Sequence, residues 1–308
     1  MKRLLLLSFA VVMLFSIAGC TTNNEAETFE SPYFEGDSGL EAEFEMMGSV
    51  SDTSGVNEIW EDESFPIEVI LKNKGEKDLE PTQVKVTLKG FAQGDFNGIE
   101  TMTKSNPDEI EKVSEYLPEG GEDRLNFGNA QHNLNFDGFY DAIIQAEIRY
   151  YYETYVAVPQ VCFKYDIKDD TVCTLDEMKD YYVSSAPIQA TSVAEKPGGR
   201  GTIYLEIDVT NTDGFTGEGR SAVPGEAIKI EYDKIGFEVV NPNSAPNLWE
   251  CTSGGVEGVA RLTDGTATIR CKAPVPEDAN YVQPFNLILK YDYVENIQEN
   301  VRIKENME

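Results

Sequence analysis

After Gly39, apolar and charged positions alternate over much of the chain. The clearest alternating runs cover residues 40–46, 84–89, 205–210, 228–232 and 287–291. A period of two, with one apolar and one charged face, is typical of half-buried antiparallel strands. Turn-forming sequences separate these runs, namely NKGEKD, TDGFTGEG, NPNSAPN and TDGT. The pattern therefore predicts an all-β chain that folds as antiparallel β-sandwiches.

Two segments carry helix signals instead. In SNPDEIEKVSEYL (residues 105–117), Asn106 can cap a helix whose later apolar residues fall on one face. In CTLDEMKDYY (residues 173–182), Thr174 and Glu177 have the spacing of a capping box. We expect both segments as short helices inserted into the sandwiches.

A weak internal repeat divides the pattern in two. IEVILKNKG (Ile67–Gly75) aligns with LEIDVTNTDG (Leu205–Gly214), and in both a strand ends in an asparagine-containing turn. Chance similarity of two strands is the alternative. We expect two tandem immunoglobulin-like antiparallel β-sandwiches, at residues 40–185 and 186–308, because 308 residues exceed the size of one such sandwich.

The first twenty residues have a different pattern. Lys2 and Arg3 precede an apolar run at residues 4–17, which is shorter than the ~20 residues that a membrane-spanning helix needs. A positive start, a short apolar core and a small-residue end describe a secretory signal. The end of this segment, Ile-Ala-Gly-Cys with the cysteine at position 20, resembles the lipobox of bacterial and archaeal lipoproteins.

The lipobox resemblance implies a signal peptide at residues 1–19, cleavage before Cys20, and attachment of a diacylglycerol-type lipid to its sulfur. Two acyl chains meet the requirement for stable anchoring. The chain would then be exported and held at the outer face of the cytoplasmic membrane or cell envelope. Residues 20–39 hold five acids and no base, which predicts a flexible acidic tether after the lipidated cysteine. An ordinary signal peptide that happens to contain a cysteine is the alternative.

Four cysteines remain when Cys20 is set aside. They fall into two local pairs, Cys162 with Cys173 and Cys251 with Cys271. On the oxidising side of a membrane, an even number of cysteines favours disulfides, here between nearest neighbours. A zinc site is the alternative, although neither pair has the short spacing of a zinc knuckle.

FPIEVILKNKGEKDLEPTQVKVTLKG (residues 65–90) resembles the opening strands of CARDB-like domains. These are cell-adhesion-related, immunoglobulin-like domains of archaeal and bacterial surface proteins. The resemblance rests on apolar spacing and one turn, and it implies an immunoglobulin-like fold and a role at the cell surface. DGTATIRC, with Trp249 near a cysteine pair, also resembles late immunoglobulin strands. The spacing of twenty residues from Cys251 to Cys271 is shorter than that of the usual inter-sheet bridge.

The charge of the chain excludes some partners. With 55 acidic and 25 basic residues, its formal net charge is −30. This argues against nucleic acid, which needs a basic binding surface. Nucleophilic triads need a histidine base, and the only histidine, His132, lies in the polar segment GNAQHNLNF, where we expect it on the surface. Phosphate-binding loops, dinucleotide fingerprints and HExxH are absent from the sequence, so we expect a non-enzymatic protein.

Two groups of residues are candidate binding residues. Tyr150, Tyr152 and Tyr155 lie in a predicted strand, where an exposed tyrosine face would contact a protein or a glycan. Packing against the inserted helix is the alternative. Acidic turns offer oxygen ligands for Ca²⁺, and the candidate ligands are Asp166, Asp169, Asp170 and Asp213. Plain polar turns are the alternative, and no other cofactor is expected.

These features together predict a membrane-anchored cell-surface lipoprotein that acts as an adhesion, scaffold or envelope-assembly module. Its partners would be the membrane, through the lipid at Cys20, and an envelope or cell-surface protein or glycan. One alternative is a pilin-like subunit that polymerises by strand addition, with the C-terminal NVRIKENME as either the donated strand or a closing strand. The other is a solute- or glycan-binding lipoprotein with a roomy aromatic pocket.

Overall fold

The computed structural model describes seven ranges of the chain. They are residues 30–34, 36–50, 56–133, 136–212, 219–229, 231–240 and 248–306. Within these ranges the chain forms strands β1 to β20 and one 3₁₀ helix, η1 (Gln93–Asp95). All strand pairs are antiparallel except the pair of β3 with β20, so the predicted all-β antiparallel fold is confirmed. Residues 31–308 form one compact unit.

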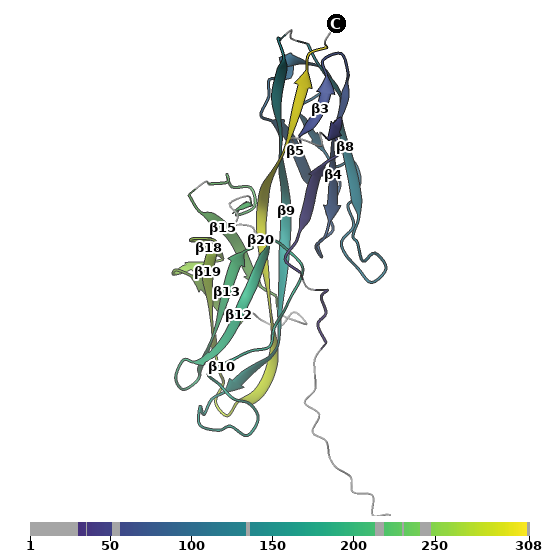
Figure 1. Ribbon diagram of the computed structural model, residues 1–308. Coiled ribbons are helices and arrows are strands. Elements are labelled where there is room, and N and C mark those ends of the chain that lie inside the picture. Colours follow the sequence, from purple (N-terminus) through teal and green to yellow (C-terminus); the bar gives the residue numbers. More distant parts are fainter. Residues whose placement is uncertain are drawn as a thin grey trace, which may run out of the picture. The chain divides into compact units, whose positions relative to one another are not determined.

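Two long strands organise this unit. β9 (Phe139–Lys164) and β20 (Asn280–Lys304) are antiparallel neighbours over their whole lengths, apart from one register shift near Gln283. Figure 1 shows them running side by side, β9 in teal and β20 in yellow. Every second residue of β9 from Ala142 to Val158 is buried, so one face of this ribbon faces the core throughout.

The ribbon is the centre of the largest sheet, whose strand order is β18-β15-β20-β9-β5-β7. Its shorter main strands are β5 (Val84–Lys89), β7 (Thr103–Ser105), β15 (Asp233–Val239) and β18 (Val259–Leu262). Four further strands attach to it or to one another at its edges, namely β2 (Ser49–Val50), β3 (Asn57–Trp60), β11 (Tyr182–Val183) and β14 (Arg220–Ala222).

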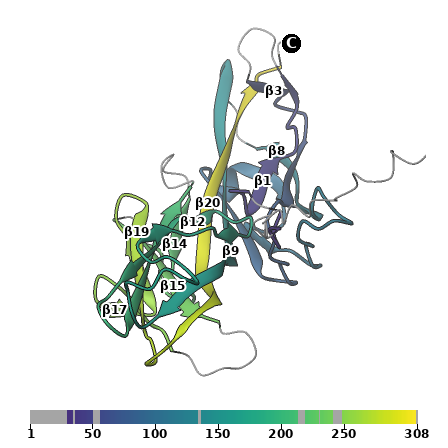
Figure 2. The same ribbon diagram turned by 90° about the horizontal axis from the view of Figure 1, so that it is seen from below.

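Two smaller sheets pack near opposite ends of the ribbon (Figures 1 and 2). The four-stranded sheet has the order β1-β4-β8-β6 and lies toward the end of the ribbon that holds the C-terminus. Its strands are β1 (Leu40–Phe44), β4 (Phe65–Asn73), β6 (Phe96–Ile99) and β8 (Glu122–His132). The six-stranded sheet has the order β10-β12-β13-β19-β16-β17. Its strands are β10 (Glu177–Met178), β12 (Ile188–Pro197), β13 (Thr202–Asn211), β16 (Glu250–Ser253), β17 (Val256–Glu257) and β19 (Thr266–Pro274).

Each half of the unit has the strand order of an immunoglobulin sandwich. In the first repeat, β1-β4-β8-β6 corresponds to strands A-B-E-D and β5-β9 to C-F, while the edge strand β7 follows β6 in the chain and is an addition beside C. In the second repeat, β12-β13-β19-β16 corresponds to A-B-E-D and β15-β20 to C-F, and the edge strand β18 likewise follows D in the chain. The aligned stretches that end in Asn73 and Asn211 lie in β4 and β13, which are the B strands of the two repeats. The topology therefore agrees with the predicted tandem repeat.

The two repeats exchange their last strand. An immunoglobulin sandwich places strand G beside F. Here the C-terminal half of β20 lies beside β9 in the first repeat, and the C-terminal half of β9 lies beside β20 in the second. Each long strand is therefore F in one repeat and G in the other. The predicted boundary between residues 185 and 186 stays a prediction, because both repeats share these two strands.

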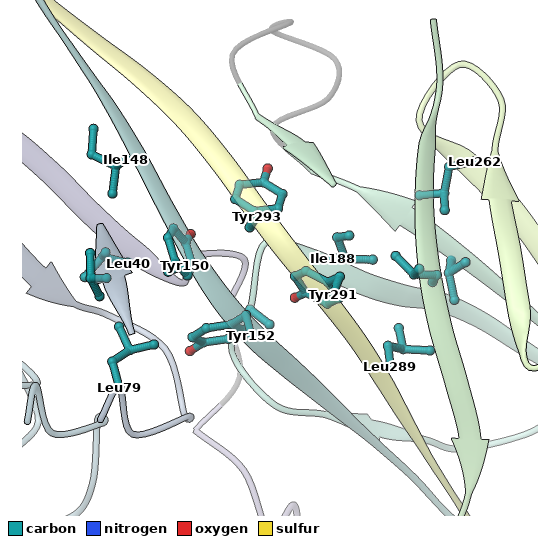
Figure 3. Packing of buried hydrophobic residues seen from close by; sticks show 14 of the residues in the cluster. Leu40, Leu79, Ile148, Tyr150, Tyr152, Ile188, Leu262, Leu289, Tyr291 and Tyr293 are labelled. Carbon is teal, nitrogen blue, oxygen red and sulfur yellow. The ribbon is translucent and has the colours of Figure 1, made fainter. Parts of the chain in front are cut away.

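Four tyrosines fill the core where the repeats meet. They are Tyr150 and Tyr152 on β9 and Tyr291 and Tyr293 on β20, each at most 2% exposed. In Figure 3 they lie between Leu40 and Leu79, from the first repeat, and Ile188 and Leu262, from the second. The hydroxyl of Tyr291 lies 2.9 Å from that of Thr154, so this aromatic core is also tied by buried hydrogen bonds.

The predicted helix at residues 105–117 is wrong. The Asn106 side chain does not cap a helix but is completely buried, where its Oδ1 accepts a hydrogen bond from the Val84 amide at 2.8 Å. Further along, Ile110 forms a β-bridge with Leu79. These long-range bonds outweigh the weak intrinsic helix preference of a short segment.

The predicted helix at residues 173–182 is also wrong. This stretch contains β10, which pairs with β12, and the start of β11, which pairs with β9. The predicted strand at residues 228–232 is displaced as well, because β15 begins at Asp233. The buried Asp233 carboxylate fixes this start by accepting a hydrogen bond from the Ser221 amide at 2.7 Å.

The end of the predicted tether is docked on the folded unit. The Ser185 hydroxyl donates to the carbonyl of Ser38 at 2.9 Å, and the Gln189 amide donates to that of Gly36 at 2.8 Å. The backbone N–H of Lys74 donates to the carbonyl of Gly39 at 2.8 Å. The prediction of a flexible segment is therefore wrong for residues 36–39, which bridge the two repeats. Cys20 and residues 21–29 lie outside the described residues.

Candidate binding site

The outward face of β9 carries a different pair of tyrosines from its inward face. Tyr150 and Tyr152 point into the core and are buried, so the prediction that they form a binding surface is wrong. The reason is the two-residue period of the strand, which sends Tyr151 and Tyr155 to the opposite face. Tyr155 is half-buried there, so it is the one predicted binding tyrosine that reaches the surface.

Glu153 holds these two outward tyrosines in place. The hydroxyls of Tyr151 and Tyr155 donate to its two carboxylate oxygens, one to each. Burial raises the pKa of the Glu153 carboxyl, but the hydrogen bonds from the two tyrosines outweigh it and hold the pKa below its ordinary value. Burial and the same hydrogen bonds raise the pKa of both tyrosines. We call Glu153 with Tyr151 and Tyr155 the tyrosine clamp. It keeps both tyrosines neutral and oriented on the outward face of β9.

Tyr155 lines a cleft of about 430 Å³. The cleft lies where the N-terminal segment crosses the first repeat, and its lining residues are Pro32, Tyr33, Phe34, Glu76, Lys77, Asp78, Lys112, Val113, Ser114 and Tyr155. A cleft of this size is in the range that binds small ligands or a few residues of a polymer. Of the lining residues, the sequence analysis had singled out only Tyr155 as a binding residue.

The NKGEKD turn after β4 positions the polar wall of the cleft. Glu76 accepts hydrogen bonds from the backbone amides of Phe34, at 3.1 Å, and Ser185, at 2.7 Å. Asp78 accepts from the Lys112 amide at 2.9 Å and pairs with the Lys112 ammonium at 3.2 Å. Both acids are therefore used to join distant segments, which brings Phe34 and Lys112 to the same cleft.

Two residues at the start of this turn explain its shape. Asn73 is completely buried, and its Nδ2 donates to the carbonyls of Lys77 and Ile110 at 2.8 and 3.0 Å. Gly75 packs against the Tyr152 hydroxyl so closely that a Cβ on it would lie 1.7 Å from that oxygen. The Asn-x-Gly signal in the sequence could have pointed to this turn, but its buried partners are distant in the chain.

The cleft combines aromatic walls with balanced charge. Tyr33, Phe34 and Tyr155 supply ring surfaces, while two lysines and two acids give no net charge. Such a lining suits an uncharged polar ligand, whose apolar face packs on a ring while hydroxyl or amide groups bond the charged side chains. A peptide segment or a neutral glycan has this chemistry.

The predicted Ca²⁺ ligands are engaged with the protein itself. The buried ammonium of Lys164 contacts Asp170 Oδ1 at 2.5 Å and the Asp169 carbonyl at 3.0 Å. The Asp169 carboxylate accepts from the Thr171 amide and hydroxyl, and Asp166 accepts from the Lys168 amide at 3.1 Å. The lysine thus supplies the positive charge that a metal ion would bring, so the calcium prediction is wrong for this loop.

The fourth predicted calcium ligand, Asp213, lies outside the described residues. In the described part of the chain, no group of three or more histidine, cysteine, aspartate or glutamate side chains is arranged to hold a metal ion.

His132 is buried, so the prediction that it lies on the surface is wrong. It lies at the end of β8, and its ring centroid is 5.3 Å from those of Phe96 and Phe136 and 4.7 Å from that of Tyr140. Neither ring nitrogen makes a hydrogen bond to a described residue. The imidazole therefore packs as one more aromatic ring of the first repeat.

Both predicted disulfides are confirmed. Cys162–Cys173 joins β9 to the loop that follows it, and Cys251–Cys271 joins residues directly opposite on β16 and β19. The second bridge lies within one sheet, with its Cα atoms 4.0 Å apart, which agrees with its short spacing in the sequence. Two disulfides are typical of an oxidising, extracellular environment. Among the described residues, no helix is long and apolar enough to cross a membrane.

No known family model matches this chain, and no curated protein is significantly similar to it in sequence.

Proposed function

We propose that this chain is a non-enzymatic lipoprotein of the cell surface that binds an envelope or cell-surface partner through the cleft at Tyr155. The observation that carries this proposal is the cleft itself, in which three aromatic rings and balanced charges converge from distant parts of the chain. Within the described residues, the only histidine is packed among aromatic rings and the acidic loop around Lys164 is internally neutralised.

The anchoring part of the proposal rests on the lipobox at Cys20 and is supported by the two disulfides, which suit an exported chain. Lipid attachment is tested by replacing Cys20 with serine. We expect the wild-type chain in the membrane fraction, with a lipid mass on its N-terminal peptide, and the C20S chain without that mass. A wild-type N-terminal peptide without lipid contradicts the anchor.

The binding part is tested with purified envelope polysaccharide and with arrays of immobilised neutral glycans and envelope peptides. We expect binding by the wild-type protein and a loss of about tenfold or more in the Tyr33→Ala, Tyr155→Ala double variant, as for aromatic hot-spot residues. The matched control is Tyr204→Ala on β13, which removes a half-buried tyrosine that does not line the cleft. Equal loss in both variants, or no binding to any of the three probe classes, contradicts this function.

The pilin-like alternative loses one of its supports. The segment Val301–Lys304 pairs with β9 on one side and β3 on the other within the same chain, so it acts as a closing strand and not as a strand donated to another subunit. A solute-binding role needs an enclosed pocket, whereas this cleft lies on the surface and includes half-buried Tyr33 and Tyr155.

A further inference from the structure

The carboxylates in the cleft at Tyr155 are already used by the fold. Glu76 accepts hydrogen bonds from two backbone amides, one at each of its carboxylate oxygens. One oxygen of Asp78 accepts from the Lys112 amide, and the other pairs with the Lys112 ammonium. Each carboxylate oxygen of the cleft therefore has a partner within the chain before a ligand arrives.

The hydrogen-bond donors of the cleft are used less. The Lys77 ammonium gives one hydrogen bond to a described residue, the Asp78 carbonyl at 3.1 Å, and keeps two N–H groups. The Tyr33 hydroxyl has no hydrogen-bond partner among the described residues, although the backbone of Tyr33 is bonded locally. The Ser114 hydroxyl oxygen accepts from a backbone amide at 3.1 Å, which leaves its hydrogen to donate. The cleft therefore offers a ligand more donors than acceptors.

Aromatic rings lie beside these donors. Tyr33, Phe34 and Tyr155 all line the cleft, together with the aliphatic side chain of Val113. The Phe34 side chain is 54% exposed, although large apolar side chains are usually buried. Tyr155 gives its hydroxyl hydrogen to Glu153 in the tyrosine clamp, so it offers the ligand a ring and no donor. A ligand therefore meets apolar ring surfaces with N–H and O–H groups among them.

This excess of donors selects among the ligands that suit an uncharged aromatic cleft. Sugar hydroxyls and ordinary peptide N–H groups are donors, and a donor that turns toward the cleft loses water without gaining an acceptor. Proline has a carbonyl acceptor and no N–H. A proline-rich segment therefore presents only acceptors and apolar rings. It also adopts the extended polyproline II conformation before it binds, which lowers the entropy lost on binding to an aromatic groove.

We infer that the cleft binds a proline-rich segment of an envelope or cell-surface protein in the polyproline II conformation. The proline rings pack on Tyr33, Phe34 and Tyr155, and the carbonyls of the segment accept hydrogen bonds from the Lys77 ammonium and the Tyr33 hydroxyl. The segment is uncharged, because the two lysines and two acids of the cleft balance one another. This inference rests on the proposed function, since it assigns a chemical class of partner to the same cleft.

The first test measures binding of three short fluorescent peptides to the protein. The first is an oligoproline, the second has alanine at every other position, and the third has N-methylalanine at those positions, which again lacks the N–H. We expect the alanine peptide to bind about tenfold more weakly than oligoproline, and the N-methylalanine peptide to bind more tightly than the alanine peptide. Equal binding of the first two peptides, no binding of oligoproline, or an N-methylalanine peptide as weak as the alanine peptide overturns the inference.

The second test removes the donors one at a time. Tyr33→Phe keeps the ring and removes the hydroxyl, and Lys77→Met keeps the aliphatic stem and removes the ammonium. We expect each variant to weaken oligoproline binding by about fivefold, the usual effect of one hydrogen bond. The matched controls are Tyr204→Phe on β13 and Lys272→Met on β19, which lie outside the cleft and should leave the affinity unchanged. Cleft variants that bind like their controls overturn the inference.

A third measurement separates this inference from the proposed function. The same protein is tested on immobilised neutral glycans and on envelope peptides without proline. Binding to these probes that is lost in the Tyr33→Ala, Tyr155→Ala double variant, without binding to oligoproline, overturns the partner class and leaves the proposed function standing. Failure to bind any of the probes overturns both.

Discussion

Asn73 and Asn211 show how much of this fold depends on single buried polar side chains. Each ends the B strand of its repeat and is completely buried. Asn73 donates to the Ile110 carbonyl, while Asn211 accepts from the Tyr293 hydroxyl at 2.9 Å. Buried amides persist where their hydrogen bonds are satisfied. The sequence shows an asparagine before a turn in both repeats, but the distant partners that make it a core residue appear only in the fold.

Replacement of Gly75 by alanine should destabilise the protein by roughly 2–3 kcal/mol, because the new Cβ overlaps a packed core. It would lie 1.7 Å from the Tyr152 hydroxyl and 2.9 Å from the Ser185 carbonyl oxygen. Urea denaturation followed by circular dichroism measures the change. The control is Gly94→Ala, whose Cβ has no neighbour within 4 Å.

A double-mutant cycle identifies the cause of this destabilisation. Since Tyr152→Phe removes the oxygen nearest to the new Cβ, Gly75→Ala should cost less in the Tyr152→Phe background than in the wild type. Strict additivity of the two changes would show that the Tyr152 hydroxyl is not the obstacle.

At the scale of the element, the alternation of apolar and charged positions predicted strands well, whereas the capping signals predicted two helices that do not form. The runs at residues 84–89, 205–210 and 287–291 all lie in strands. In each of them the apolar side chains are buried and the alternate polar side chains are more exposed, which is the pattern that the period of two predicts. The helix signals failed at residues 105–117 and 173–182 because these segments bond to strands that are distant in sequence. Local signals cannot show such partners.

The outward face of β9 gives a prediction about acid stability. Burial raises the pKa of Glu153, but hydrogen bonds from Tyr151 and Tyr155 bring it below the ordinary value of 4.5. A carboxyl with a lowered pKa in the folded state stabilises the fold above its unfolded-state pKa and loses that contribution as the pH falls through the folded-state pKa. Glu153→Gln should therefore lose less free energy of unfolding than the wild type between about pH 6 and pH 3.

The measurement is urea denaturation across that pH range. The control is Glu250→Gln, which removes an exposed carboxylate from β16 and should follow the wild-type curve. Parallel curves for Glu153→Gln and the wild type would contradict a stabilising role for the tyrosine clamp.

For the whole molecule, the main feature is the exchange of strands between the repeats. The sequence predicted two sandwiches, and two sandwiches are present, but nothing in the alternation shows which repeat a strand end joins. The same limit applies to the cleft. Tyr155 was a candidate from the sequence, whereas Tyr33, Phe34 and Lys77 reach the same cleft only because the N-terminal segment docks beside the turn after β4.

Removal of residues 295–308 should destabilise the first repeat, although these residues are the last in the chain. The deletion takes Val301 and Ile303, both completely buried, out of the core between β9 and β3. Burial of two such side chains contributes about 3–6 kcal/mol. Hydrogen exchange should show lost protection in β3 and in the N-terminal half of β9.

A chain that ends at Lys304 is the control for this truncation, because it keeps all of β20. It should retain the protection of the full chain. Unchanged protection of β3 in the shorter chain, which ends at Val294, would show that the first repeat is stable without its exchanged strand.

The exchanged strands also set the order in which the protein can fold. A chain is made from its N-terminus onward, and a domain usually folds once its own residues have emerged. Here the first repeat cannot complete its large sheet until residues 301–304 are made. These residues pair with residues 57–60, which precede them by more than two thirds of the sequence. Contacts of such high sequence separation slow folding and leave strand edges exposed in the meantime. Until residues 301–304 have been made, the part of the first repeat that they cover stays exposed.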